Sequence, residues 1–153
     1  MTNGVICFGA HGNKFASVVT PYEGFLTSLK LVHVSGQVIC DNNAPQYNNK
    51  WGCSRKHPAL GKTPFNVVIT AGGHGGILYP SELFLRDPKV PLWYELPDVD
   101  PNAPEIVLGD SSYPYYVTSG QEIRIWHGRD LRNGDEENDA GKVCFTVKGW
   151  FTF

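Results

Sequence analysis

The run Leu26–Val34, with the sequence LTSLKLVHV, decides the fold class. Its side chains alternate along the chain, so that Leu29 and Leu31 point to one face and Lys30 to the other, which is the period of a β-strand. The last run, Lys142–Phe153, has the sequence KVCFTVKGWFTF and alternates in the same way. Each run therefore predicts a strand that turns one face toward a core.

Between these two runs lie further short segments rich in β-branched and aromatic residues, which favour strands. The 17 glycines and 11 prolines make turns frequent, and no helical periodicity persists for long. We therefore predict an all-β fold, an antiparallel jelly-roll-like β-sandwich that forms a single domain over residues 1–153. The other predicted strands are Val5–Phe8, Ser17–Thr20, Gln37–Cys40, Asn66–Ala71, Leu83–Arg86, Leu92–Glu95, Glu105–Leu108, Tyr115–Thr118 and Glu122–Trp126.

Composition and charge exclude several classes of protein. The chain has 153 residues, of which 41% are hydrophobic and 18% are charged, and this is typical of a globular protein with a buried core. The net charge is -2, and there is no basic stripe to neutralise phosphates, so nucleic acid is not expected as a partner. No apolar run is long enough to span a bilayer.

The four cysteines allow two disulfides. Cys40 and Cys53 bracket a polar loop and could staple it, while Cys7 and Cys144 could pair with each other, or one of them could bridge two subunits. Zinc binding by Cys40, Cys53 and His57 is the competing use, but their spacing matches no common zinc module. No signal peptide is visible at the amino terminus, yet we expect an oxidising, extracellular setting and thus a secreted protein.

An acidic stretch, Trp126–Gly141, separates the last two predicted strands and is rich in carboxylate and amide side chains. Ca²⁺ takes about six to eight oxygen ligands from such groups and from backbone carbonyls. A strand-to-strand loop of this length can fold back, so that Asp130 at its start meets Asn138 and Asp139 at its end. The acidic spacing does not fit an EF-hand. The alternative is a solvated surface loop.

A second polar stretch, Asp41–Gly61, carries the aromatic side chains of Tyr47 and Trp51 together with His57. Sugars have apolar C–H faces and fixed hydroxyls, so their sites combine a ring platform with a few aimed donors and acceptors. Trp51 either contacts a ligand or anchors the loop to the core. Pro58 restrains the backbone of His57 and so directs its imidazole.

Two sequence blocks stand out in these stretches. The first is Lys50–Gly52 followed by Arg55, His57-Pro58 and Gly61, and the second is Asp130-Leu131 followed by Asn138–Gly141, directly before the final strand. In these blocks and in their order along the chain, the protein resembles the LecA-type galactose-binding lectin family, above all the galactose-specific lectins of sea anemones.

The resemblance implies a small jelly-roll sandwich that binds one Ca²⁺ and chelates the sugar directly onto it. Two departures from the family pattern are that Leu60 stands in place of a glutamine and Asp139 in place of an asparagine. The implied metal ligands are the side chains of Asp130, Asn138 and Asp139 and the backbone carbonyls of Asp135 and Tyr47. The implied sugar-binding residues are His57, which would bond the galactose 6-hydroxyl, with Pro58, Asp130, Leu131, Asn138 and Tyr47.

The predicted function is therefore that of a calcium-dependent lectin, not an enzyme, which binds terminal galactose and β-galactosides through the sugar 3- and 4-hydroxyls. It would meet membranes only through glycoconjugates. Since one monosaccharide site binds weakly, agglutination needs several sites, and we expect a homo-oligomer, with a dimer favoured. The alternatives are a glycosidase with paired carboxylates and a calcium-dependent lipid-binding or matrix adhesion sandwich.

Overall fold

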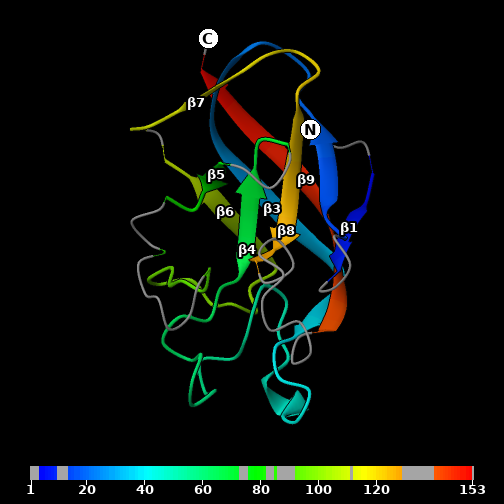
Figure 1. The fold of residues 1–153 in the computed structure, drawn as a ribbon, viewed down its shortest axis with the longest axis vertical. Helices are drawn as coiled ribbons and strands as arrows, with labels where there is room; N and C mark the ends of the chain where they lie inside the picture. Colours follow the sequence, from blue (N-terminus) through cyan, green and yellow to red (C-terminus); the bar gives the residue numbers. More distant parts are fainter. Residues whose placement is uncertain are drawn as a thin grey trace.

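The two runs that predicted the fold class pair with each other at the centre of the larger sheet. In the computed structural model shown in Figure 1, β3 (Gly24–Ile39) runs antiparallel to β9 (Ala140–Thr152), from Phe25 opposite Thr152 to Ile39 opposite Ala140. The structure describes residues 4–9, 14–72, 76–81, 85, 92–110, 112–128 and 140–152.

The described part of the chain contains two antiparallel sheets, and this confirms the predicted all-β sandwich. Among these residues no helix is long and apolar enough to cross a membrane. The first sheet has the order β1 (Ile6–Gly9), β9, β3 and β6 (Glu105–Gly109), with β7 (Tyr115–Val117) also paired to β3. The second has the order β2 (Ala16–Val19), β8 (Glu122–His127), β4 (Val67–Thr70) and β5 (Ile77–Tyr79).

The core lies between the sheets and is filled by the alternating side chains. Leu29 and Leu31 of β3 are fully buried, as is Phe145 of β9, and they belong to one cluster with Ile123 and Ile125 of β8. The predicted alternation of the two deciding runs is therefore confirmed, because burial of one face requires a period of two.

Three strand predictions need correction. Leu26–Val34 and Gln37–Cys40 belong to one strand, because the register shift between His33 and Ser35 absorbs the predicted break as a bulge. Leu92–Glu95 is not a strand, since Leu92 has a φ of 67° and Tyr94 makes only an isolated bridge to Phe65. The three residues of β5 were not predicted, because so short a strand shows no periodicity. Of Leu83–Arg86, all but Leu85 lie outside the described residues.

All four cysteines pair within the chain. Cys7 is bonded to Cys144, its partner across β1 and β9, and Cys40 is bonded to Cys53. No thiol is left to bridge two subunits, and the sulfurs of Cys40 and Cys53 are not free to bind zinc. Such disulfides are typical of proteins from oxidising compartments.

Candidate functional site

The polar stretch 41–61 forms a loop at one end of the sandwich. It follows directly from the end of β3 and contains the 3-10 helix η1 (Pro45–Tyr47), drawn in cyan at the bottom of Figure 1. Figure 1 places β5 and β7 toward the opposite end of the molecule. Loops at the ends of a rigid sandwich are the usual positions for binding residues.

Trp51 anchors this loop to the core. Its side chain is fully buried, its Nε1–H donates to the carbonyl of Ala103 at 2.8 Å, and its ring packs edge-on against Phe145. Of the two roles open to Trp51 in the sequence, the structure therefore supports the anchor, because a fully buried ring has no surface left for a ligand.

His57 has both ring nitrogens engaged by neighbouring groups. The backbone N–H groups of Ala59 and Leu60 donate to Nδ1, each at 3.0 Å, and Nε2 lies 3.2 Å from Oδ2 of Asp41. Because Nδ1 accepts two hydrogen bonds, the neutral ring must carry its hydrogen on Nε2 and donate it to Asp41. The tautomer of His57 is thus determined by its surroundings.

Asp41 was not predicted as a site residue, yet it completes this arrangement. Its Oδ1 accepts the backbone N–H of Asn43 at 2.9 Å, and its Oδ2 accepts from His57. These two bonds, the Asn43 bond foremost, lower the pKa of the Asp41 carboxyl below its usual value. With 30% of its side chain exposed, Asp41 presents an ionised carboxylate to solvent.

Tyr47 lies beside His57, with the ring centroids 5.0 Å apart and the rings edge-on. Its backbone carbonyl, a predicted metal ligand, accepts the N–H of Ser54 at 3.0 Å. A carbonyl oxygen has two lone pairs, so this bond leaves one for a cation. Pro58 is exposed next to His57, whereas Leu60 is buried in the core and offers nothing to a ligand.

The other predicted site residues, Asp130, Leu131, Asp135, Asn138 and Asp139, lie outside the described residues. Within the described ranges no three His, Cys, Asp or Glu side chains gather closely enough to hold a metal ion.

The two ends of the acidic stretch are nevertheless placed. The N–H of Gly128, just after β8, donates to the carbonyl of Asn66 at 2.8 Å, and Ala140, the first residue of β9, pairs with Ile39. Since Ile39 is the last residue of β3, the acidic stretch enters the sheet where the chain leaves it toward Asp41. Asp41, where the first polar stretch begins, therefore follows the residue that pairs with Ala140, near the end of the second stretch.

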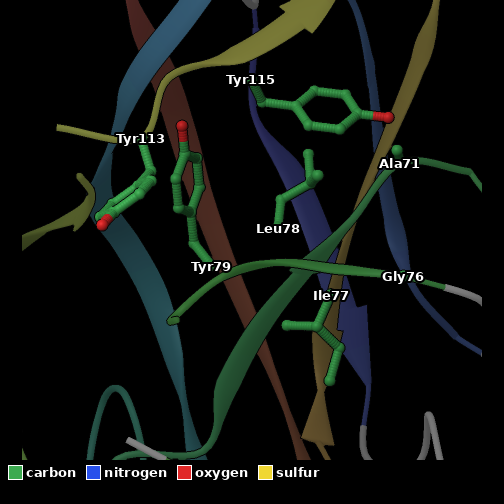
Figure 2. Close-up of a pocket in the computed structure, with 7 residues that line it drawn as sticks. All are labelled: Ala71, Gly76, Ile77, Leu78, Tyr79, Tyr113 and Tyr115. Atoms are coloured by element: carbon green, nitrogen blue, oxygen red, sulfur yellow. The ribbon is translucent and has the colours of Figure 1, made fainter. Parts of the chain in front are cut away.

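A separate hollow of about 310 Å³ lies near β5 and β7, as Figure 2 shows. The ring of Tyr115 lies over Leu78, and the ring of Tyr113 lies beside that of Tyr79, whose hydroxyl donates to the carbonyl of Leu26. The residues that line this hollow include none with a charged side chain. The loop 41–61, with its carboxylate and imidazole, is therefore the stronger candidate for a polar ligand such as a sugar.

Comparison with known proteins gives a match that extends over the whole fold. The structure is similar to that of AJLec, a lectin from the sea anemone Anthopleura japonica, with a TM-score of 0.87 and 30% sequence identity. The match covers 99% of this chain and 95% of the AJLec chain. No protein-family model matches the sequence, and no curated protein does.

Proposed function

The chain belongs to the same family of lectins as AJLec, with which it shares 30% identity over 99% of its length, and from this premise we propose that it is a calcium-dependent lectin for terminal galactose. The family membership supports carbohydrate recognition rather than catalysis. Calcium dependence, the preference for galactose and the LecA-type arrangement of the site are our proposal.

One observation carries the proposal. The loop with Tyr47 and His57 leaves the sheet after Ile39, and the acidic stretch enters it at Ala140, the residue paired with Ile39. The first segment thus begins, and the second ends, at the same end of the β3–β9 pair, and each carries one block of the resemblance. One small ligand could then contact the ring of Tyr47, the imidazole of His57 and the carboxylate of Asp41 together with the acidic stretch proposed to bind calcium.

Calcium suits the residues of these two polar stretches, because the proposed ligand atoms are all oxygens. The side chains of Asp130, Asn138 and Asp139 and the carbonyls of Asp135 and Tyr47 would hold the ion, and the Tyr47 carbonyl keeps a lone pair beyond its bond to Ser54. When bound, the ion supplies open coordination positions to two neighbouring sugar hydroxyls.

The preference for galactose would follow from the direction of one hydroxyl. Galactose carries an axial 4-hydroxyl beside an equatorial 3-hydroxyl, whereas the 4-hydroxyl of glucose is equatorial. A site built for the first pair leaves a polar group unpaired with glucose. An unpaired buried group costs about 1–3 kcal/mol, which is about fivefold to about 150-fold in affinity.

We also propose that the protein is secreted and acts as a homo-oligomer, with a dimer favoured. The Cys7–Cys144 and Cys40–Cys53 disulfides support secretion. The oligomer is proposed from the weak affinity of a single monosaccharide site, since several linked sites raise avidity by about 10²–10⁴.

Red-cell agglutination tests this proposal directly. We expect agglutination with calcium, loss of it with a chelator, and inhibition by galactose but not by glucose or mannose. Agglutination that persists in the chelator, or that mannose inhibits best, contradicts the proposal. Calcium-dependent pelleting with anionic liposomes in the absence of agglutination favours the lipid-binding alternative, and release of a chromogenic aglycone from a galactoside favours the glycosidase.

A further inference from the structure

We propose that Asp41 is a specificity-determining residue of the lectin site: its carboxylate accepts a hydrogen bond from a hydroxyl of the bound saccharide and excludes saccharides that carry a carboxylate at that place. The inference rests on the proposed function, because it assumes that the loop 41–61 contacts the sugar. It assigns a contact to a residue outside both blocks of the resemblance, and it predicts that the site prefers neutral sugars to uronic acids.

The first step concerns His57. The two backbone N–H groups that donate to Nδ1 leave Nε2–H as the ring's sole hydrogen-bond donor, and this donor lies 3.2 Å from Oδ2 of Asp41. A sugar hydroxyl that reaches Nε2 therefore also comes within reach of the carboxylate. The one hydrogen on Nε2 is already donated to Oδ2 of Asp41, so a hydroxyl that arrives at this pair donates its own hydrogen to a free lone pair of the carboxylate.

The second step concerns the orientation of Asp41. Its two oxygens are held by different groups, Oδ1 by the N–H of Asn43 at 2.9 Å and Oδ2 by His57. The backbone on its amino-terminal side is held by the disulfide between Cys40 and Cys53. A carboxylate has about four lone-pair positions, so two bonds leave capacity for a ligand. Because the side chain is already oriented and 30% exposed, a sugar would not have to order it.

The third step concerns charge. Two cations of the same loop are turned to other partners: Arg55 forms a bidentate pair with Glu95 and also donates to the carbonyl of Val99, and the Nζ of Lys50 donates to the carbonyl of Asn102. Neither these two nor Lys56, the third cation of the loop, is bonded to the carboxylate of Asp41, which accepts from Asn43 and His57. A carboxylate on the ligand would therefore meet a like charge at short range, which is unfavourable for binding.

The test is isothermal titration of the full chain in calcium with galactose, galacturonic acid and mannose. In Asp41→Asn the side-chain oxygen still accepts the N–H of Asn43, so the turn is kept, but the acceptor for the hydroxyl and the negative charge are lost. We expect galactose to bind about tenfold more weakly, equivalent to about 1.4 kcal/mol, and the preference for galactose over galacturonic acid to shrink by at least as much.

Asp110→Asn is the matched control. Oδ1 of Asp110 accepts the N–H of Ser112 at 2.8 Å, the same turn that Asp41 forms, and the variant makes the same change of charge. The N–H of Asp110 donates to the carbonyl of Thr27, near the start of β3, whereas Asp41 follows the end of that strand. We expect this variant to bind all three sugars like the wild type.

His57→Asn separates the positioning role of His57 from its role in the fold. Its Oδ1 can still accept the N–H groups of Ala59 and Leu60, but no donor reaches Asp41. If His57 acts through Asp41, this variant weakens galactose binding as much as Asp41→Asn does. The double variant then binds galactose no more weakly than either single variant, because the two residues form one unit.

The outcomes separate the inference from the proposed function. Wild-type affinity and wild-type exclusion of galacturonic acid in Asp41→Asn overturn the inference while the lectin proposal stands. If the wild type prefers mannose, and Asp41→Asn weakens mannose binding and allows galacturonic acid to bind, the galactose proposal fails and the inference stands. If the folded wild type binds none of the sugars in calcium, both fail.

Discussion

Removal of the disulfide between Cys40 and Cys53 should both destabilise the protein and weaken the candidate site. The bond closes a segment with a sequence separation of 13, and the entropy of closing a loop of that size is worth about 3 kcal/mol at 25 °C. The bond between Cys7 and Cys144 spans a separation of 137, for which the same relation gives about 5 kcal/mol. The double variants Cys40→Ala/Cys53→Ala and Cys7→Ala/Cys144→Ala remove one bond each.

Urea unfolding followed by tryptophan fluorescence measures these losses. With a slope of about 2 kcal/mol per molar urea, the midpoint should fall by about 1.5 M without the first bond and by about 2.5 M without the second. Cys40 and Cys53 are almost fully buried, so the space left by their sulfurs adds to the first figure.

The variant that loses less stability, without the Cys40–Cys53 bond, should lose more affinity for galactose. The segment closed by Cys40 and Cys53 carries Asp41 and Tyr47, so its loss of order has to be reversed when a ligand binds. The Cys7–Cys144 bond joins strands that are already paired. At a temperature where both variants are folded, we expect galactose to bind more weakly only without the Cys40–Cys53 bond. Weaker binding only without the Cys7–Cys144 bond, or equal midpoints for both variants and the wild type, would refute the reasoning.

Further variants test the site and its surroundings. Asp130→Ala should lose calcium and galactose together in titrations, since both are proposed to share that carboxylate; normal galactose binding would disprove the assignment. Trp51→Phe removes the bond to the Ala103 carbonyl and leaves a small cavity, so it should cost about 2–3 kcal/mol in urea unfolding but leave the ranking of sugars unchanged. Tyr113→Ala, in the hollow of Figure 2, should leave galactose affinity within about twofold of the wild type, and a larger loss would point to a sugar contact there. Because folding lowers the pKa of Asp41 below its ordinary value of 3.8, its charged form stabilises the fold above that pH, and this contribution is lost as pH falls through the folded-state value. The difference in melting temperature between wild type and Asp41→Asn should thus be constant from about pH 7 to about pH 5 and shrink below about pH 4.

The two strands that decided the fold class were predicted correctly because each has one buried face. In β3 and β9 the burial of Leu29, Leu31 and Phe145 imposes a period of two that is visible without any structure. The errors fall where backbone conformation overrides side-chain pattern. Gly36 has a φ of 85°, and the carbonyl of Lys142 approaches it so closely that a Cβ there would lie 1.9 Å from that oxygen. A glycine that looked like a break therefore lies inside a continuous strand, paired with Val143, just beyond the bulge between His33 and Ser35.

The candidate site was predictable only in part. Tyr47 and His57 could be singled out because aromatic and imidazole groups in a polar loop suggest a sugar site, and the structure places them in contact. Asp41 could not, because its role depends on a contact with His57, 16 residues further along the chain. The cysteine spacing permitted more than one pairing, and the choice depended on the register that places Cys7 opposite Cys144.

The organisation of the loop explains how a weak ligand can be recognised by few groups. The burial of Trp51 and the disulfide from Cys40 to Cys53 hold the loop to the core, and the pair of Arg55 with Glu95 holds its outer part. The free energy for this order comes from folding and not from a ligand, so the contact proposed for Asp41 would contribute to affinity with little entropic loss. The same constraints would make the proposed site selective, because a carboxylate that cannot move away from a uronic acid repels it. The proposal therefore couples stability and specificity in this loop: a variant that loosens it should lose discrimination between neutral and acidic sugars along with its affinity for galactose.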